Sequence, residues 1–132
     1  MRIAADTNIL LRDALHDDPL QARIAAKVLE SAELVAIPVA VFCEFVWVLR
    51  QGYKKPAAEI ADAIRRLLRS ASVVTNRPAV EAGLAVLDLG GDFADGAIAY
   101  EGEWLGAAEF VSFDKQAVSL LKSQGKRARL LA

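Results

Sequence analysis

Several kinds of chemistry are disfavoured by residues that the sequence nearly lacks. The 132 residues include one cysteine, Cys43, and one histidine, His16. A single cysteine cannot form an internal disulfide or a zinc-binding cysteine cluster, and it fits a reducing, cytoplasmic compartment. Cys43 lies in an apolar stretch without an evident activating base, so we do not expect a cysteine nucleophile. His16 lies in a polar loop sequence, so we do not expect a Ser-His-Asp triad.

Long hydrophobic runs are also missing. Apolar runs such as residues 39–43 and 45–49 are far shorter than the roughly 20 residues of a membrane-spanning helix. We therefore expect no membrane partner, and the N-terminus begins with a strand pattern instead of a signal peptide. The sequence has no Gly-x-x-x-x-Gly-Lys phosphate-binding loop, and Gly90-Gly91 is typical of a helix stop.

The apolar share is high, 55%, at a length that suits one domain over residues 1–132. Strand-like runs alternate with helical patterns, which predicts a parallel sheet with helices on both faces. The predicted fold class is therefore α/β, a three-layer α/β/α sandwich around a parallel sheet of four to five strands. We expect strands at 1–5, 34–37, 72–74, 109–112 and 129–131, and helices at 20–31, 38–50, 77–89 and 92–104, from residue 56, and after residue 115.

The net charge of −1 and the isoelectric point of about 5.8 do not by themselves suggest a nucleic-acid partner. The basic residues are nevertheless grouped, and a cation that neutralises clustered acids would leave them to face phosphate. A solvated helix face is the commoner explanation for each group. The groups are Lys54-Lys55, Arg65-Arg66 with Arg69, and residues 122–129.

Two acidic residues stand out in the first half of the chain. Asp6 directly follows the first apolar strand, at the sheet edge where open α/β folds bind ligands. Thr7 and Asn8 can then bond local backbone groups and begin the next turn. Glu44 is the only charge in an otherwise apolar helix, and its burial would require a metal, an arginine or a cap as compensation. The alternative is that Glu44 lies on an exposed seam of this helix.

Three aspartates in the second half occupy the starts of elements. Asp92 and Asp95 are three residues apart at the start of an expected helix, so both can face one crevice. Simple capping is the alternative, and Asp92 can cap while Asp95 reaches a metal. Asp114 follows the fourth expected strand as Asp6 follows the first, which brings the two together if those strands are neighbours. For Asp114 the alternative is a turn aspartate.

Together these carboxylates predict a divalent metal site. Carboxylates a few ångströms apart repel, and some would stay protonated without a partner. Mg²⁺ or Mn²⁺, held by carboxylate oxygens and water, removes that repulsion. Such a metal polarises phosphate and activates water, so the natural reaction is phosphodiester hydrolysis with a metal-activated water.

With these motifs, the chain resembles the PIN-domain ribonucleases of the VapC toxin type over essentially its whole length. The resemblance is carried by Asp6-Thr7-Asn8, by residues 38–49 with Glu44, by residues 92–99 with Asp92 and Asp95, and by Val111-Ser112-Phe113-Asp114-Lys115. It implies a sheet with strand order 3-2-1-4-5 and Mg²⁺- or Mn²⁺-dependent cleavage of RNA. It assigns catalysis and metal binding to Asp6, Glu44, Asp95 and Asp114, with support from Asp92, Asn8, Ser112 and Thr7.

Two departures from the family pattern affect these assignments. Ser112 stands where the family often has threonine, which keeps the hydroxyl. Gly96 stands where a larger residue is usual, so we expect it to loosen the first turn of the helix that carries Asp95.

The resemblance also implies a homodimer and an antitoxin protein that occludes the cleft. The apolar residues of the 38–50 helix agree with such contacts, although a core position is the commoner role for any one of them: Phe42, Phe45, Trp47 and Val48. Substrate phosphates would lie against basic residues at the rim, which position a strand without reading its sequence. The candidates are Arg12, Lys54, Lys55, Arg65 and Lys115.

Two other functions are compatible with an acidic α/β pocket. A receiver-like signalling domain would use an aspartate as phospho-acceptor. Its first strand usually ends in a paired acid, whereas Ala5-Asp6 offers one, and Lys115 does not stand alone at a strand end. A non-catalytic RNA-binding or interaction module would keep the fold and bind no Mn²⁺.

Overall fold

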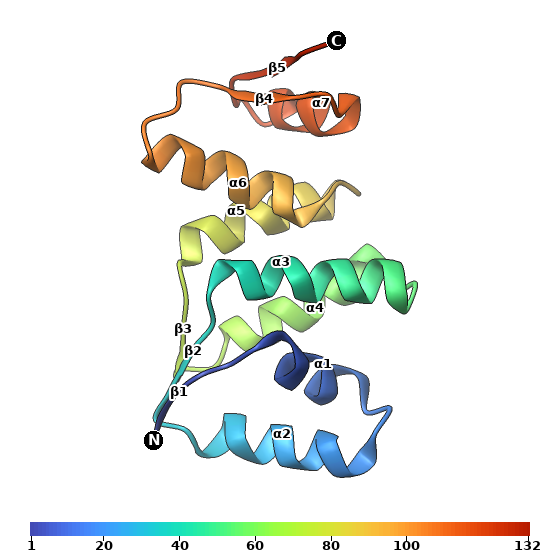
Figure 1. Cartoon of the computed structure of the whole chain (residues 1–132), viewed down its shortest axis with the longest axis vertical. Coiled ribbons are helices and arrows are strands. Elements are labelled where there is room, and N and C mark those ends of the chain that lie inside the picture. Colours follow the sequence, from blue (N-terminus) through green and yellow to red (C-terminus); the bar gives the residue numbers. More distant parts are fainter. The chain divides into compact units, whose positions relative to one another are not determined.

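The computed structural model describes residues 1–132, which divide into two compact units, Met1–Asn76 and Arg77–Ala132. The elements of both units are drawn in Figure 1. Across the chain, no helix combines the length and the apolar character that crossing a membrane requires.

The first unit is built on a three-stranded parallel sheet with the order β1-β2-β3. The register pairs Ile3 with Val35, and Val35 in turn with Val73. Each connection between the strands contains helices, as expected for parallel neighbours. The elements are β1 (Arg2–Ala4), α1 (Thr7–Leu15), α2 (Pro19–Ser31), β2 (Leu34–Ala36), α3 (Val39–Trp47), the π-helical η1 (Val48–Gly52), α4 (Ala57–Leu68) and β3 (Val73–Val74).

Local sequence explains where these helices begin. Asp18 is the N-cap of α2, where its side chain accepts a hydrogen bond from the backbone N–H of Gln21 at 3.1 Å, and Pro19 follows at the first position. Pro38 and Pro56 immediately precede α3 and α4. The predicted helix over 38–50 is therefore confirmed as α3, which continues into the π turn η1.

The core of the first unit includes one face of α3. Phe42 and Phe45 are fully buried, so the core role that the sequence favoured for these residues is confirmed. Trp47, at the end of the same helix, is 63% exposed.

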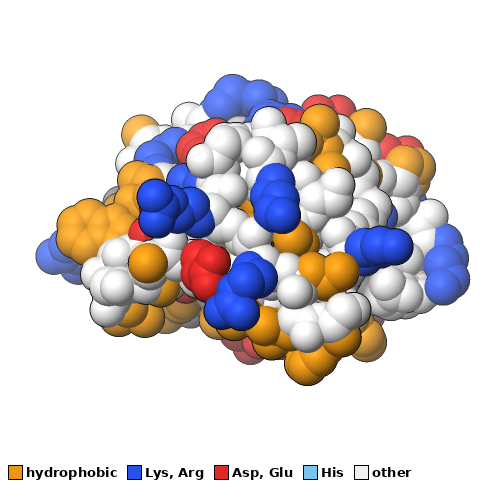
Figure 2. Space-filling model, turned by 90° about the horizontal axis from the view of Figure 1, so that it is seen from above, with side chains coloured by type: hydrophobic (Ala, Val, Ile, Leu, Met, Phe, Trp, Pro, Cys, Tyr) orange, Lys and Arg blue, Asp and Glu red, His pale blue; other side chains and the backbone are white.

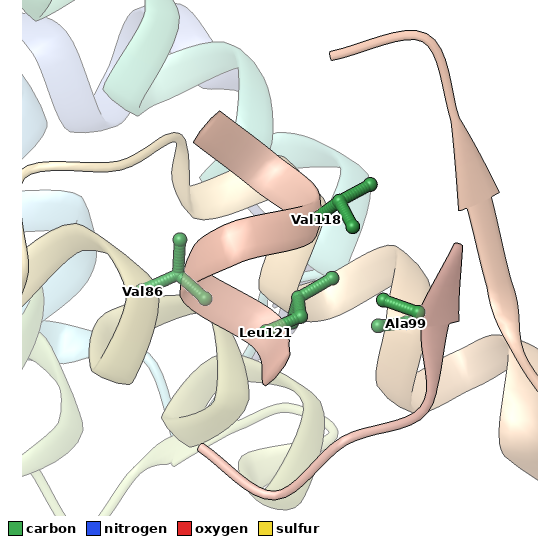
Figure 3. Close-up of a cluster of buried hydrophobic side chains, with 5 residues drawn as sticks. Val86, Ala99, Val118 and Leu121 are labelled. Atoms are coloured by element: carbon green, nitrogen blue, oxygen red, sulfur yellow. The ribbon is translucent and has the colours of Figure 1, made fainter. Parts of the chain in front are cut away.

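The second unit pairs two parallel strands beside three helices. Its elements are α5 (Arg77–Asp88), α6 (Phe93–Trp104), β4 (Phe110–Ser112), α7 (Lys115–Ser123) and β5 (Ala128–Leu130). The register pairs Phe110 with Ala128 and Ser112 with Leu130. Figure 3 shows the core, in which Val86, Ala99, Val118 and Leu121 come together from α5, α6 and α7.

The predicted α/β class and the parallel direction of the strands are confirmed, but a single sheet of four to five strands is not. The structure contains the strand order 3-2-1 in one sheet and the pairing of β4 with β5 in a second sheet. Each strand has only two or three residues, so each ladder holds few hydrogen bonds. Period and composition locate such short strands in the sequence without specifying which strands become neighbours.

Candidate functional site

Asp6 lies at the C-terminal end of β1, as predicted, and it begins α1. Its side-chain Oδ1 accepts a hydrogen bond from the backbone N–H of Ile9 at 3.2 Å, which makes it the N-cap. Ala5 before it is 2% exposed, whereas Asp6 itself is exposed. The buried end of the strand therefore fixes the backbone, and the carboxylate faces outward with one oxygen engaged in capping.

Glu44 lies close to the start of the same helix. The Thr7 hydroxyl donates a hydrogen bond to Oε2 of Glu44 at 3.3 Å, which links α1 to α3 across 37 residues of sequence. Glu44 is exposed, so the burial that the sequence suggested is not found, and the alternative of an exposed seam on α3 holds. The contact places the Glu44 carboxylate next to the residue that follows Asp6.

A cavity of about 360 Å³ opens beside Asp6 between α1 and α2. Its polar lining includes Asp6, Asn8, Arg12 and Gln21. Asn8 is exposed on the first turn of α1, and its supporting role stays a prediction.

Arg12, a predicted phosphate ligand, is already paired. Its Nη1 lies 2.8 Å from Oδ1 of Asp17, and the Tyr53 hydroxyl donates a hydrogen bond to Oδ2 of Asp17 at 3.2 Å. The hydrogen bond with Tyr53 is the largest cause that raises the pKa of Arg12; burial opposes it, and the charge of Asp17 adds to the rise. This network engages the Arg12 side chain and ties the segment after η1 to α1.

The two lysines predicted at the rim follow Tyr53 directly. Lys54 and Lys55 are exposed, and Lys54 adopts a left-handed backbone with φ of 54°. Lys55 forms a long ion pair of 3.9 Å with Glu59, of a kind that is easily exchanged for a phosphate. Both lysines therefore stay accessible.

Asp92 and Asp114 are helix caps in the second unit. The Asp92 carboxylate accepts from the backbone N–H of Ala94 at 3.2 Å and begins α6. The Asp114 carboxylate accepts from the N–H groups of Gln116 and Ala117 at 2.9 and 3.1 Å and begins α7. The capping interpretation of Asp92 is therefore confirmed, and Asp114, for which the alternative was a turn aspartate, is also a helix cap.

Ser112 contributes to the position of Asp114. Its Oγ accepts a hydrogen bond from the backbone N–H of Asp114 at 2.9 Å, at the end of β4. The hydroxyl thus fixes the turn that presents the carboxylate, which agrees with the supporting role predicted for Ser112.

Asp95 is the residue whose charge the fold disfavours most. Burial, and then the charges of Asp92 and Asp114, raise the pKa of Asp95 from 3.8 to about 6. Asp95 is half-buried in the first turn of α6. Asp92, Asp95 and Asp114 therefore share one electrostatic environment, and that environment favours a compensating cation.

Gly96 holds the helix that carries Asp95 firmly, so the expected loosening is wrong. A Cβ atom at Gly96 would meet the carbonyl group of Ala82 and approach Cα of Gly83 to 2.9 Å. A Cβ atom at Gly83 would in turn lie 2.6 Å from the ring of Phe93, which is fully buried. Close contact between α5 and α6, which requires glycine at both positions, fixes the start of α6.

The carboxylates suit a hard divalent cation in their chemistry, because they supply anionic oxygen donors with at least one oxygen outside the capping bonds. The structure holds no group of three or more Asp, Glu, His and Cys side chains arranged to hold a metal ion. The metal ligands Asp6, Glu44, Asp95 and Asp114 therefore stay a prediction.

Sequence reasoning missed two features of the site. The hydrogen bond from Thr7 to Glu44 and the network of Arg12, Asp17 and Tyr53 both join residues more than 30 positions apart. Only the hydrogen bond from Thr7 to Glu44 could have been suspected from the sequence, because Thr7 lies beside Asp6 in the opening motif. The structure brings Thr7 and Glu44 into contact in the first unit, and in the second unit the charges of Asp92 and Asp114 act on Asp95.

Comparison with known proteins gives the class. The sequence model of the PIN domain matches residues 3–120, which is most of the chain. The chain therefore belongs to the PIN domain family, whose members are generally nucleases that act on nucleic acid and typically depend on divalent metal ions. Among curated proteins, no match to the chain is found.

Proposed function

We propose that this protein is a metal-dependent endoribonuclease of the VapC toxin type, formed by a single PIN domain over residues 1–132. The observation that supports it best is the PIN match over residues 3–120, and the site agrees with it, because burial and two neighbouring aspartates raise the pKa of Asp95 to about 6. A carboxylate whose negative charge is disfavoured in this way is suited to bind a hard cation.

In this proposal each carboxylate has a role. Asp95 and Asp6 are the principal ligands of Mg²⁺ or Mn²⁺, Asp114 and Glu44 complete the set, and Asp92 supports it. When bound, the cation supplies positive charge against the phosphate and lowers the pKa of the attacking water. Asp6 and Glu44 belong to the first unit and the other three to the second, so their joint action rests on the sequence motifs.

The chain's own contacts would keep these groups in place. The seating of α6 against α5 holds Asp95, the Ser112 hydroxyl holds the turn before Asp114, and the Thr7 hydroxyl holds Glu44. Such fixed positions reduce the rearrangement that catalysis would otherwise require.

The test is cleavage of a labelled RNA by purified Asp6→Asn and Asp95→Asn variants in Mn²⁺. We expect each to lose activity by on the order of 100-fold or more, because each removes an anionic metal ligand. Glu101→Gln and Asp62→Asn are the controls, since both remove an exposed acid outside the motifs. Cleavage that survives both Asp6→Asn and Asp95→Asn would make the assignment wrong, and absence of Mn²⁺ binding would favour the non-catalytic alternative.

An antitoxin partner and a homodimer belong to the same proposal. Leu20, Ile24 and Val28 recur every fourth residue on α2 and are 60%, 55% and 36% exposed. Such a stripe suits the apolar face of a partner helix, and the cavity beside Asp6 continues from it. Light scattering that compares the mass of the wild type in solution with that of Trp47→Glu tests the dimer. Expression of the protein in cells tests the antitoxin, because the proposal expects growth to stop and a neighbouring reading frame to restore it.

A further inference from the structure

Charge is distributed very unevenly along this chain. All 17 acidic residues lie at or before Asp114, whereas five of the 16 basic residues follow it. We name residues 115–129 the basic segment. Its basic residues are Lys115, Lys122, Lys126, Arg127 and Arg129.

The basic segment contains α7, the following loop and β5. Lys115, Lys122, Arg127 and Arg129 are exposed, and Lys126 is partly exposed. Because Ala128 is buried in the core cluster, the alternation of β5 directs Arg129 to the opposite face. Figure 2, which views the molecule from above Figure 1, shows Lys and Arg side chains at several places on one face, among hydrophobic and a few acidic side chains.

Two of the five cations have structural partners. Nζ of Lys126 lies 3.4 Å from Glu103, and Nε of Arg129 lies 2.8 Å from Glu109. Lys115, Lys122 and Arg127 form no ion pair in the structure. These three positive charges are therefore not used in ion pairs within the unit.

A solvated helix face does not account for this group. Lys122 lies in the last turn of α7, Arg127 in the loop and Arg129 in β5, so no single helix presents them. The PIN match ends at residue 120, and four of the five basic residues lie beyond it.

We propose that the basic segment binds the phosphate backbone of single-stranded RNA, as a docking surface separate from the catalytic carboxylates. Cations without acidic partners, in a stretch devoid of acids, complement a polyanion and release its counterions on binding. The segment begins at Lys115, directly after Asp114, so a strand held along it leads to a proposed catalytic carboxylate. The choice of RNA as the polyanion rests on the proposed function.

The experiment measures binding without cleavage. Fluorescence anisotropy of a labelled 20-nucleotide RNA, in buffer with a chelator, compares the wild type with the double variant Lys122→Gln/Arg127→Gln. We expect affinity to fall about tenfold at moderate salt, and the dependence of log K on log salt to become shallower by about 1.4, as for two lost phosphate contacts. The matched control is Arg23→Gln/Lys27→Gln, which removes two exposed charges from α2.

Three results would overturn the inference: unchanged affinity in the double variant, an equal loss in the control, or equal binding of poly-glutamate to the wild type. Cleavage of a four-nucleotide substrate in Mn²⁺, measured on the same proteins, separates the two proposals. RNA binding that depends on Lys122 and Arg127, without any cleavage, would contradict the proposed nuclease function and support the docking surface. Cleavage by the wild type, with unchanged RNA affinity in the double variant, would support the nuclease function and contradict the docking surface.

Discussion

Gly96 of α6 is seated against the carbonyl group of Ala82 in α5, so closely that no side chain fits between the two helices. This contact sets the distance between α5 and α6 at the turn that carries Asp95. The same helix contains a second glycine, Gly102, whose added Cβ would have its nearest neighbour at 3.8 Å. Substitutions at Gly96 and Gly102 can therefore distinguish two effects of replacing glycine: the steric clash with α5, which arises only at Gly96, and the gain in helix propensity, which arises at both.

Gly96→Ala is expected to lower the free energy of unfolding by about 1–3 kcal/mol, because the methyl group must push α6 away from α5. RNA cleavage should fall with it, since Asp95 moves with the helix. Gly102→Ala should instead be neutral or stabilising by up to about 1 kcal/mol, as alanine favours a helix interior. Urea unfolding measures both, and a Gly96→Ala protein as stable as Gly102→Ala would contradict the close contact.

The helix starts could be predicted from the sequence because they depend on local hydrogen bonds. Asp18, Asp92 and Asp114 all accept from backbone N–H groups two or three residues ahead, and a sequence window contains all that this requires. The order of the parallel strands was predicted only in part. The sequence pattern of a short strand shows where the strand lies in the chain, but it does not show which strands pair with it.

The other differences concern contacts with distant residues. Glu44 lies among apolar neighbours in sequence, yet the helix presents it to solvent, where Thr7 reaches it. Gly96 has the flexibility of any glycine in isolation and loses it only because α5 occupies the space. Arg12 looks accessible until the fold brings Tyr53 and Asp17 to it. In each case the deciding partner lies outside the pattern that suggested the role.

Asp95 should make the stability of the metal-free protein depend on pH. Its pKa is about 6 when folded and 3.8 in the reference state, through burial and the charges of Asp92 and Asp114. Between these values the folded chain keeps a proton that the unfolded chain has released. The contribution of Asp95 to the free energy of unfolding is therefore fully present below about pH 3.8 and is lost as the pH rises through about 6. The free energy of unfolding decreases over this range of pH.

Urea unfolding at a series of pH values, with EDTA present, measures this effect. Asp95→Asn should remove the decrease, and Glu101→Gln, an exposed acid of the same helix, should retain it. Solvent screens part of the interaction, because Asp95 is only half-buried. An NMR titration that places the pKa of Asp95 near 4 would contradict the electrostatic environment described for it.

Mn²⁺ should reverse the order of stability between wild type and Asp95→Asn. Without metal, the variant is expected to melt at a higher temperature, because it lacks the disfavoured charge. With Mn²⁺ at about 100 times its dissociation constant, the wild type gains about 2.7 kcal/mol and the variant much less. Thermal unfolding with and without Mn²⁺ measures the crossover, and equal stabilisation of both proteins would place the metal away from Asp95.

Thr7→Val should lower kcat for RNA cleavage by about 2- to 10-fold while the fold persists. The substitution keeps the shape of the side chain and removes the hydroxyl that donates to Glu44, a bond whose net worth is about 0.5–1.5 kcal/mol. Thr7→Ser should keep most of the activity, because the donor remains.

The same threonine-to-valine change at Thr75 provides the matched control. The Thr75 hydroxyl is buried and has no hydrogen-bond partner, so its removal should leave cleavage unchanged and stability equal or higher. If Thr7→Val and Thr7→Ser lose the same activity, the hydroxyl does not position Glu44, and Thr7 acts only through its place in the first turn of α1. If Thr75→Val also loses activity, the effect at Thr7 reflects a general response to lost hydroxyls. Single-turnover rates at saturating concentrations distinguish these outcomes, because they report the cleavage step free of differences in RNA binding and product release.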